Sequence, residues 1–372
     1  MDLVVRLNKS TNSSRLPKLE FEDIVAGEGR LNKDVSQKFD NRKGIEFLPN
    51  DILYGKLRPY LKNWLKATFT GVALGDFWVF RVKNSDSDFI YSLIQADRYQ
   101  KAANDTSGTK MPRSDWKKVS GTVFYVPNDL KEQQKIGTLF KQIDDAITLH
   151  QRKLDQLKEL KTAYLQVMFV SMKTKNNKVP KLRFADFGGE WDQRKSKELF
   201  IPKSEKNQPN LPVLSVTQDS GVVYRDQVGI DIKYDSTTLK NYKVVNKNDF
   251  VISLRSFQGG FELSDKKGIT SPAYTIFVPK DIKLHDNLFW KTQFKTFQFI
   301  EALKTVTFGI RDGKSISFTE FGDLKLCFPK NKKEQQKIGK FFEELDYAIS
   351  LHQNKLTQLK SLKKSYLQNM FI

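Results

Sequence analysis

The sequence predicts an α+β protein in which two mixed α/β domains are separated by two long helices that pack on each other. Three observations favour this fold class. A stretch of about forty residues occurs twice, and each copy carries a helical apolar repeat. The segments that precede the two copies hold short strand-like runs and share weak landmarks.

The repeated stretch covers residues 131–170 and 333–372, and the two copies agree at about two-thirds of their positions without a gap. The second copy starts 202 residues after the first in a chain of 372. This spacing excludes a short-period solenoid and indicates one large unit built twice, with pseudo-twofold internal symmetry.

Each copy predicts a long helix. Asn128 or Asp129 can cap the first one, because their side-chain oxygens accept hydrogen bonds from the free backbone donors at a helix start. Apolar residues then follow a heptad-like ladder, and Gly137 suggests a bend between a short and a long helix. The same ladder recurs in the second copy.

Neither helix can bury such a seam alone, so we infer that the two seams meet. The predicted helix-pairing residues are Ile147, His150, Leu154, Leu157 and Tyr164, with Ile349, His352, Leu356, Leu359 and Tyr366 in the second copy. We interpret the two histidines as buried polar positions that fix helix register rather than as metal ligands or acid–base groups. The alternative is that each helix packs on its own domain or on a partner protein.

The segments between the helices predict mixed α/β structure. In the first, we expect strands at residues 46–49, 52–54, 77–82 and 122–126 and a helix at 87–102. In the second, we expect strands at 211–216, 250–254 and 273–278 and a helix at 286–304. Residues 181–199 have no counterpart in the first segment, whose match to the second begins only near Leu16 and Pro17.

Charge and composition narrow the class of protein. The chain has a net charge of +20, of which the two repeats carry only +2 and +3, so the excess lies on the segments between them. A basic surface there points to a polyanion partner such as nucleic acid. A single cysteine, Cys327, excludes an intrachain disulfide and a cysteine-based zinc site, and it sits in an apolar run typical of a buried strand.

No apolar run approaches the length of about 20 residues that a membrane span needs, and the start of the sequence lacks a signal-peptide layout. We therefore expect a cytoplasmic protein without membrane contact. No catalytic or metal constellation can be assembled from the three histidines, and the sequence lacks the glycine-rich loop and tetrapeptide that base methylation would need. Residues 309–315 are one residue short of a phosphate-binding loop.

Basic and polar loop residues recur at matching places in the two segments. Arginine can make two hydrogen bonds to guanine and glutamine two to adenine, so these loops are candidates for reading DNA, although a solvated loop is the simpler interpretation. The candidate DNA-binding residues are Lys56, Arg58, Lys110 and Arg113 in the first segment and Arg255, Ser256, Gln258, Arg311 and Lys314 in the second.

The repeated pattern EQQKIG…AI…LHQ…KL…LK…YLQ…MF resembles the specificity subunit of type I restriction-modification systems, and KLRFADFGGEWDQRKSKELF at 181–200 resembles the opening of that family's target-recognition domains. The resemblance covers essentially the whole chain. It departs at the start, because the first domain lacks its own copy of that opening block, which leaves its completeness in question.

The resemblance implies a division of labour. Two target-recognition domains, at residues 1–128 and 173–330, would each read half of a split sequence in double-stranded DNA. Two helical spacers, at 129–172 and 331–372, would pair as an antiparallel coiled coil. Two modification subunits that hold S-adenosylmethionine, and restriction subunits that use ATP and Mg²⁺, would dock on this chain, which itself would hold no cofactor and catalyse nothing.

Two other functions remain open on the residues alone. The helices could form a scaffold that organises partner proteins without reading DNA. A self-contained enzyme is the weaker option, since the sequence offers no constellation to support it.

Overall fold

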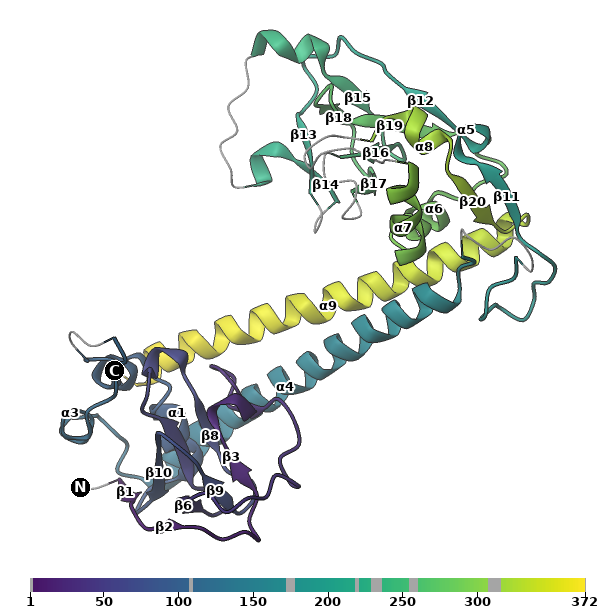
Figure 1. Cartoon of the computed structure of the whole chain (residues 1–372). Helices are drawn as coiled ribbons and strands as arrows, with labels where there is room; N and C mark the ends of the chain where they lie inside the picture. Colours follow the sequence, from purple (N-terminus) through teal and green to yellow (C-terminus); the bar gives the residue numbers. More distant parts are fainter. Residues whose placement is uncertain are drawn as a thin grey trace. The chain divides into compact units, whose positions relative to one another are not determined.

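The computed structural model describes residues 3–106, 110–171, 178–217, 221–228, 236–253, 260–306 and 316–371 (Figure 1). The chain forms two compact units. Unit 1 comprises residues 1–152 together with 352–372, and unit 2 comprises residues 153–351. The long helices α4 (Leu130–Val167) and α9 (Lys332–Met370) each contribute one part to each unit.

Helices α4 and α9 pack together in antiparallel fashion. In unit 1, Asp144 binds Lys363 at 2.6 Å, and His150 meets His352. In unit 2, Lys161 binds Asp346 at 2.5 Å. Within unit 1 the residue number rises along α4 as it falls along α9, so the predicted antiparallel pairing is confirmed.

The predicted bend at Gly137 is wrong, because α4 is one continuous helix. The glycine instead allows another helix to pack closely against α4. A Cβ at Gly137 would lie 2.6 Å from the backbone nitrogen of Phe89, and one at Gly339 would lie 2.7 Å from that of Phe289. Each long helix therefore needs a glycine where the start of a short helix presses against it.

The described residues of unit 1 form two four-stranded sheets and a small two-stranded one. The first sheet has the order β1 (Val4–Leu7), β10 (Phe77–Val82), β7 (Ile52–Gly55), β8 (Trp64–Lys66). The second has the order β2 (Ser10–Thr11), β6 (Gly44–Phe47), β9 (Gly71–Ala73), β3 (Lys18–Leu19), and β4 (Ile24–Val25) pairs with β5 (Arg30–Leu31). The short helices are η1 (Phe21–Asp23), η2 (Pro59–Leu61), α1 (Ser87–Leu93), α2 (Asp97–Ala103) and α3 (Trp116–Ser120).

Unit 2 repeats the first of these sheets as β12 (Phe200–Lys203), β19 (Thr275–Pro279), β16 (Phe250–Ile252), β17 (Phe261–Leu263). The part of unit 2 that the structure describes also holds three strand pairs: β13 (Leu214–Thr217) with β14 (Gly221–Tyr224), β15 (Lys243–Val245) with β18 (Gly268–Thr270), and β11 (Asp192–Lys195) with β20 (Lys325–Phe328). Its short helices are α5 (Ser196–Leu199), η3 (Arg225–Val228), η4 (Ser236–Asn241), α6 (Asn287–Gln293), α7 (Phe297–Val306) and α8 (Phe318–Gly322).

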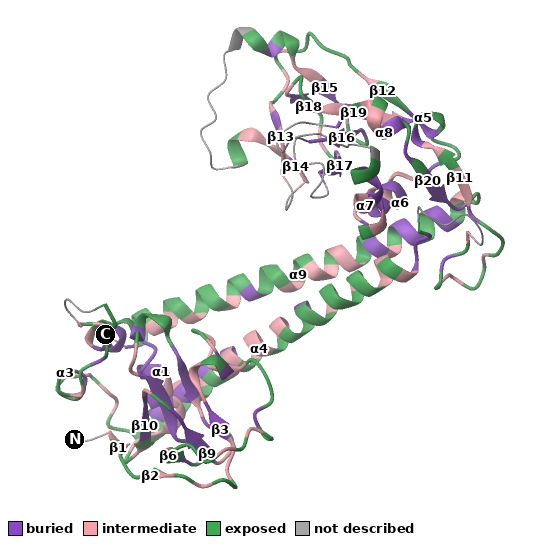
Figure 2. Cartoon of the chain, in the orientation of Figure 1, coloured by how far each residue is buried: buried purple, intermediate pink, exposed green. Residues whose placement is uncertain are grey.

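The structural match between the units starts earlier than the sequence predicts. Strand β1 takes the same sheet position as β12, so the likeness begins near Val4 rather than near Leu16. Each shared sheet packs against buried aromatic residues. Its strand β10 is mostly buried, as the purple in Figure 2 shows. Phe200, Phe250 and Phe277 form this core in unit 2, while Tyr54 and Trp78 do so in unit 1.

Three local predictions need correction. The helix predicted at 87–102 is two helices, α1 and α2, and the helix predicted at 286–304 is likewise α6 and α7. In unit 2 the break has a visible cause, since the Thr296 hydroxyl accepts a hydrogen bond from the Phe299 N–H at 3.2 Å and so starts a new helix. The strand predicted at 122–126 is not formed, because the partner that its counterpart β20 has in unit 2 comes from the unmatched block.

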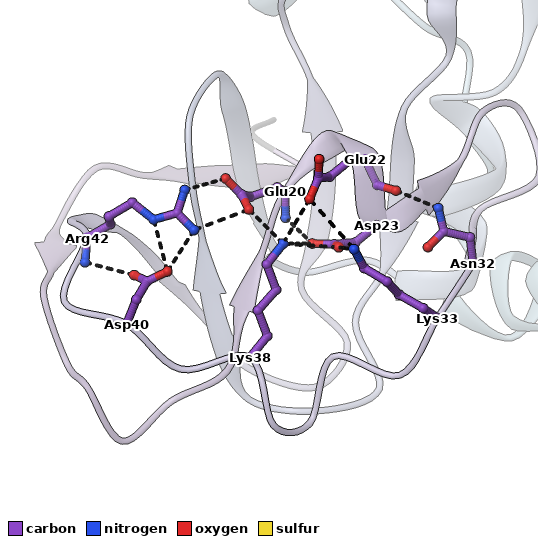
Figure 3. A network of polar contacts seen from close by, with 8 residues as sticks. All are labelled: Glu20, Glu22, Asp23, Asn32, Lys33, Lys38, Asp40 and Arg42. Atoms are coloured by element: carbon purple, nitrogen blue, oxygen red, sulfur yellow. Dashed lines mark hydrogen bonds and ion pairs between the residues drawn. The ribbon is translucent and has the colours of Figure 1, made fainter.

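A polar cluster orders residues 20–42 in unit 1 (Figure 3). The fully buried Asp23 binds Lys38 at 2.8 Å and Lys33 at 3.0 Å, and Arg42 binds Glu20 at 2.5 Å. The hydrogen bonds from Arg42 and Lys38 lower the pKa of Glu20. Burial alone would raise the pKa of Asp23, but bonds from Lys38, the Glu20 N–H and Lys33 outweigh it and lower that pKa.

Candidate nucleic-acid interface

A strained basic loop follows strand β7 in unit 1. The chain leaves the sheet at Gly55 and enters η2 through Lys56, Leu57 and Arg58. Arg58 has φ of 49° and Lys62 has φ of 57°, so two non-glycine residues adopt the left-handed conformation on either side of η2. Such backbone is sparsely populated and persists only where its surroundings hold it, which makes this loop a candidate site.

A second segment holds the loop in place. Leu57 forms an isolated β-bridge with Arg113, and the Arg58 N–H donates to the Pro112 carbonyl at 2.7 Å. The Ser114 N–H donates to the Lys56 carbonyl at 2.8 Å. The structure thereby brings together three of the candidate residues that the sequence indicates in this half, Lys56, Arg58 and Arg113. The fourth, Lys110, precedes Arg113 on the same segment.

One carboxylate organises part of this cluster. Asp76 accepts from Arg113 at 3.0 Å and lies 3.6 Å from Lys56. Ion pairs this exposed contribute little to stability, so Asp76 mainly orients the two cations. Arg58 and Lys110 are exposed, and no ion pair joins either of them to another residue in the described part of the chain.

Sequence reasoning missed the apolar part of this loop. Tyr60 is 56 % exposed and Leu61 is 40 % exposed on η2, between Arg58 and Lys62. An exposed aromatic among cations suits contact with sugars and bases as well as with phosphates. The alternation of basic and apolar residues in KLRPYLK was the signal that could have found it.

The candidate residues of unit 2 fall elsewhere. Arg255, Ser256 and Gln258, and Arg311 and Lys314, all lie outside the described residues. The phosphate-loop resemblance at 309–315 lies outside them as well. Among the described residues, only the candidates of unit 1 can be placed in the fold.

The predicted helix-pairing residues differ in how deeply they are buried and in what they contact. Leu154 and Leu356 are each 2 % exposed, while Ile147, Leu157, Ile349 and Leu359 are half-buried. Tyr164 packs on Phe341 with ring centroids 5.1 Å apart, and Tyr366 packs against the core of unit 1. The Nδ1 atoms of His150 and His352 lie 2.9 Å apart, so one ring donates and the other accepts.

A glutamine that sequence reasoning did not single out ties each long helix to its globular part. The Gln133 side chain accepts from the Asp86 N–H at 3.1 Å and donates to the Pro127 carbonyl at 2.8 Å. Gln335 makes the equivalent bonds to the Asp286 N–H and the Pro329 carbonyl, at 2.9 and 2.8 Å. Both belong to the repeated EQQKIG sequence, which therefore encodes a docking contact rather than the helix alone.

Each unit also has a groove between the long helices and its globular part. The groove of unit 2 has a volume of about 530 Å³ and contains the pair Lys161–Asp346, while that of unit 1 has about 390 Å³ and contains Lys363–Asp144. Burial raises the pKa of Asp144 despite the adjacent Lys363. The two grooves are thus built from equivalent residues of the repeat.

The described residues contain no group of three or more histidine, cysteine or acidic side chains that could hold a metal ion. None of the helices in the described ranges has the length and apolar character needed to cross a membrane. Cys327 is buried in β20, as predicted.

The family model for the type I restriction modification DNA specificity domain matches residues 64–159 and 189–361, which is well over half of the chain. The chain belongs to this family. The two matched ranges each run from a globular part into one of the repeated helices, so the duplication seen in the structure is the duplication of the specificity domain.

A solved S subunit has the same fold. The type I restriction-modification S subunit from M. genitalium aligns over 100 % of this chain and 94 % of its own, with a TM-score of 0.63 and 15 % identity. The HsdS subunit from Thermoanaerobacter tengcongensis aligns over 97 % and 93 % with a TM-score of 0.42 and 14 % identity. A search of curated protein sequences gave no match.

Proposed function

We propose that this chain is the specificity subunit of a type I restriction-modification complex and that it reads a split sequence in double-stranded DNA. The observation that carries the proposal is the duplicated unit: two like globular parts, each tied by the same glutamine and glycine to one of two antiparallel helices. Two similar DNA-binding parts in one chain suit a DNA target made of two separated halves.

The basic loop of unit 1 supports a DNA role for the globular parts. Lys56, Arg58 and Arg113 gather at one place, on the loop that also carries the exposed Tyr60. Phosphates would position the loop and base edges would supply the sequence preference. The equivalent role in unit 2 falls on Arg255, Ser256, Gln258, Arg311 and Lys314.

The complex is proposed to contain two modification subunits and restriction subunits beside DNA. In this arrangement S-adenosylmethionine, ATP and Mg²⁺ bind to the partner subunits in the cytoplasm, and the present chain directs their chemistry without performing it. The two equivalent grooves beside the paired helices support two copies of one docking partner, because they present the same ion pair twice.

Methylated-base sequencing of cells that carry this chain with its partner subunits tests the proposal. The expected result is methylation at a two-part motif whose halves are separated by a fixed gap of unspecified bases. Methylation without such a motif would overturn it.

A binding titration against salt separates a DNA reader from a pure scaffold. A reader loses affinity steeply with salt, with a slope of about −0.9 for each phosphate contact, because condensed counterions are released. Arg58→Gln should make the slope shallower by about one contact. Lys141→Gln, at an exposed position on α4, is the matched control and should leave the slope unchanged.

A further inference from the structure

The loop between β7 and β8 of unit 1 carries two adjacent apolar side chains that face solvent. Tyr60 is 56 % exposed and Leu61 is 40 % exposed, whereas Pro59 beside them is buried. Neither Tyr60 nor Leu61 belongs to a hydrophobic cluster of the described residues. Single exposed apolar residues are ordinary, but a neighbouring pair on a defined turn indicates a contact surface. We call Tyr60 and Leu61 the apolar tip.

The backbone that carries the apolar tip is fixed at both ends. The Gly55 N–H donates to the Asn63 carbonyl at 2.7 Å, which closes the loop, and the Gly27 N–H donates to the Lys62 carbonyl at 2.9 Å. With the bond that Arg58 makes to the neighbouring segment, these contacts hold the two left-handed residues of the loop in place. A tip held in this way can push into a partner, because its own backbone does not yield.

Basic residues adjoin the apolar tip. Arg58 and Lys62 lie on either side of it along η2, and both are exposed. Lys56 and Arg113 belong to the two segments that the bridge beside the loop joins, and Asp76 pairs with both. Cations around an apolar centre suit a partner with anionic edges and an apolar, aromatic interior. Stacked base pairs between two phosphate backbones have this chemistry, so duplex DNA fits the loop better than a protein surface.

The sequence of unit 2 has an aromatic residue at the equivalent position. The closing bond of the loop recurs there, since the Ser253 N–H donates to the Gly260 carbonyl at 2.9 Å. Tyr60 precedes Asn63, the acceptor in unit 1, by three residues, and Phe257 precedes Gly260 by three. An arginine stands two residues before each of these aromatics. Phe257 lies outside the described residues, so this likeness is one of sequence alone.

We propose that the apolar tip inserts between two base pairs of the DNA bound by unit 1 and unstacks them, while Arg58 and Lys62 hold the phosphates on either side. The inference rests on the proposed DNA role and deepens it. Insertion costs least where stacking is weak, as at pyrimidine–purine steps. Tyr60 is therefore a specificity-determining residue that senses how easily a base step opens, whereas arginines and glutamines sense base edges.

Fluorescence of 2-aminopurine tests the insertion, because this base is quenched when stacked and brightens when its stack opens. The DNA carries the target found by methylated-base sequencing, with 2-aminopurine in place of one adenine at a time on either strand. The full chain, together with its partner subunits, should raise the fluorescence at one step. Tyr60→Ala should abolish this rise and Tyr60→Phe should keep it. Tyr347→Ala, at a tyrosine 71 % exposed on α9, is the matched control and should also keep it.

Affinity and its salt dependence separate the apolar tip from the cations beside it. Tyr60→Ala should weaken binding of the target about tenfold, because a base–aromatic contact is lost. Its salt slope should match that of the unchanged chain, because no phosphate contact is lost, whereas Arg58→Gln should make the slope shallower. Tyr60→Phe retains the ring and should bind within about twofold of the unchanged chain.

The outcomes distinguish this inference from the proposed function. Salt-dependent binding of the target that Tyr60→Ala leaves intact, with no loss of the fluorescence rise, overturns the insertion and leaves the DNA role standing. A flat salt response of the unchanged chain overturns both. A Tyr60→Ala chain that keeps its DNA affinity but no longer assembles with its partner subunits would show that the apolar tip contacts protein, which overturns the insertion as well.

Discussion

Glu132 and Glu334 occupy the same position of the same repeated sequence, yet one is exposed and the other is buried under an arginine and a tryptophan. The helices around them are alike, and so are the glutamines that dock them. What differs is a segment that arrives from elsewhere in the chain. A repeat therefore specifies its helix and its docking contact, while the environment of a side chain depends on which neighbours the rest of the chain supplies.

The largest expected loss of stability comes from the buried leucines of the two helix seams. Leu154 in unit 2 and Leu356 in unit 1 are equivalent and equally buried, so Leu154→Asp and Leu356→Asp should cost the same. We expect about 4 kcal/mol or more in each, because an unpaired carboxylate is buried. Hydrogen exchange of each unit measures the loss. Leu149→Asp, at a position 67 % exposed, is the control, and unequal losses would break the symmetry of the seam.

Removing Glu334 or Glu132 tests the difference between their environments. Glu334→Ala should destabilise unit 2 by about 3–5 kcal/mol, because it leaves the nearly buried Arg183 guanidinium and the Trp191 N–H without their acceptor. Glu132→Ala should change the stability of unit 1 by less than about 0.5 kcal/mol, because Glu132 is exposed. Local exchange rates in each unit distinguish the two outcomes, and similar costs would show that the environments are not different.

The close-approach glycines should behave alike in both units. Gly137→Ala and Gly339→Ala each place a methyl group against the backbone of a short helix and should cost about 1–3 kcal/mol. Gly188→Ala, where a Cβ meets open space, should cost less than about 0.5 kcal/mol. Thermal unfolding followed by circular dichroism measures the three variants. A neutral Gly137→Ala would mean that α4 can shift away from α1.

Acid should weaken the polar cluster of unit 1. The folded-state pKa values of Glu20 and Asp23 are lowered, so their stabilisation is present above the ordinary carboxyl pKa of about 4 and is lost as the pH falls through the folded values. Asp23→Asn should cost about 1–2 kcal/mol at neutral pH and flatten this acid dependence. Exchange of the amides at 20–42 against pH measures it, and an unchanged profile in the variant would contradict the assignment.

Much of this fold could be predicted from the sequence, for a physical reason. A helix is set by local periodicity, so α4 and α9 follow from the ladder of apolar residues, and their pairing follows from two seams that neither can bury alone. Strand β10 was predicted with its observed bounds because it is a continuous apolar run.

The parts that escaped prediction depend on distant partners. Residues 122–126 have the composition of a strand, but a strand also needs a neighbour, and the neighbour of its counterpart lies in the unmatched block. From the sequence, Gly137 indicates a weak point in a helix. Its close approach to Phe89 is a contact between distant residues, which the local sequence does not indicate. The basic loop was found by residue type, whereas the left-handed Arg58 and Lys62 that shape it depend on contacts with residues 112–114.

The division of the chain into units also sets an order of assembly during synthesis. Unit 2 is the continuous segment 153–351, so it can close as soon as that segment has left the ribosome. Unit 1 begins at the other end but needs residues 352–372, whose Phe371 packs on Phe89 and Phe140. The first half to be translated is therefore the last to be completed, and until then it exposes the apolar surface that Phe371 later covers.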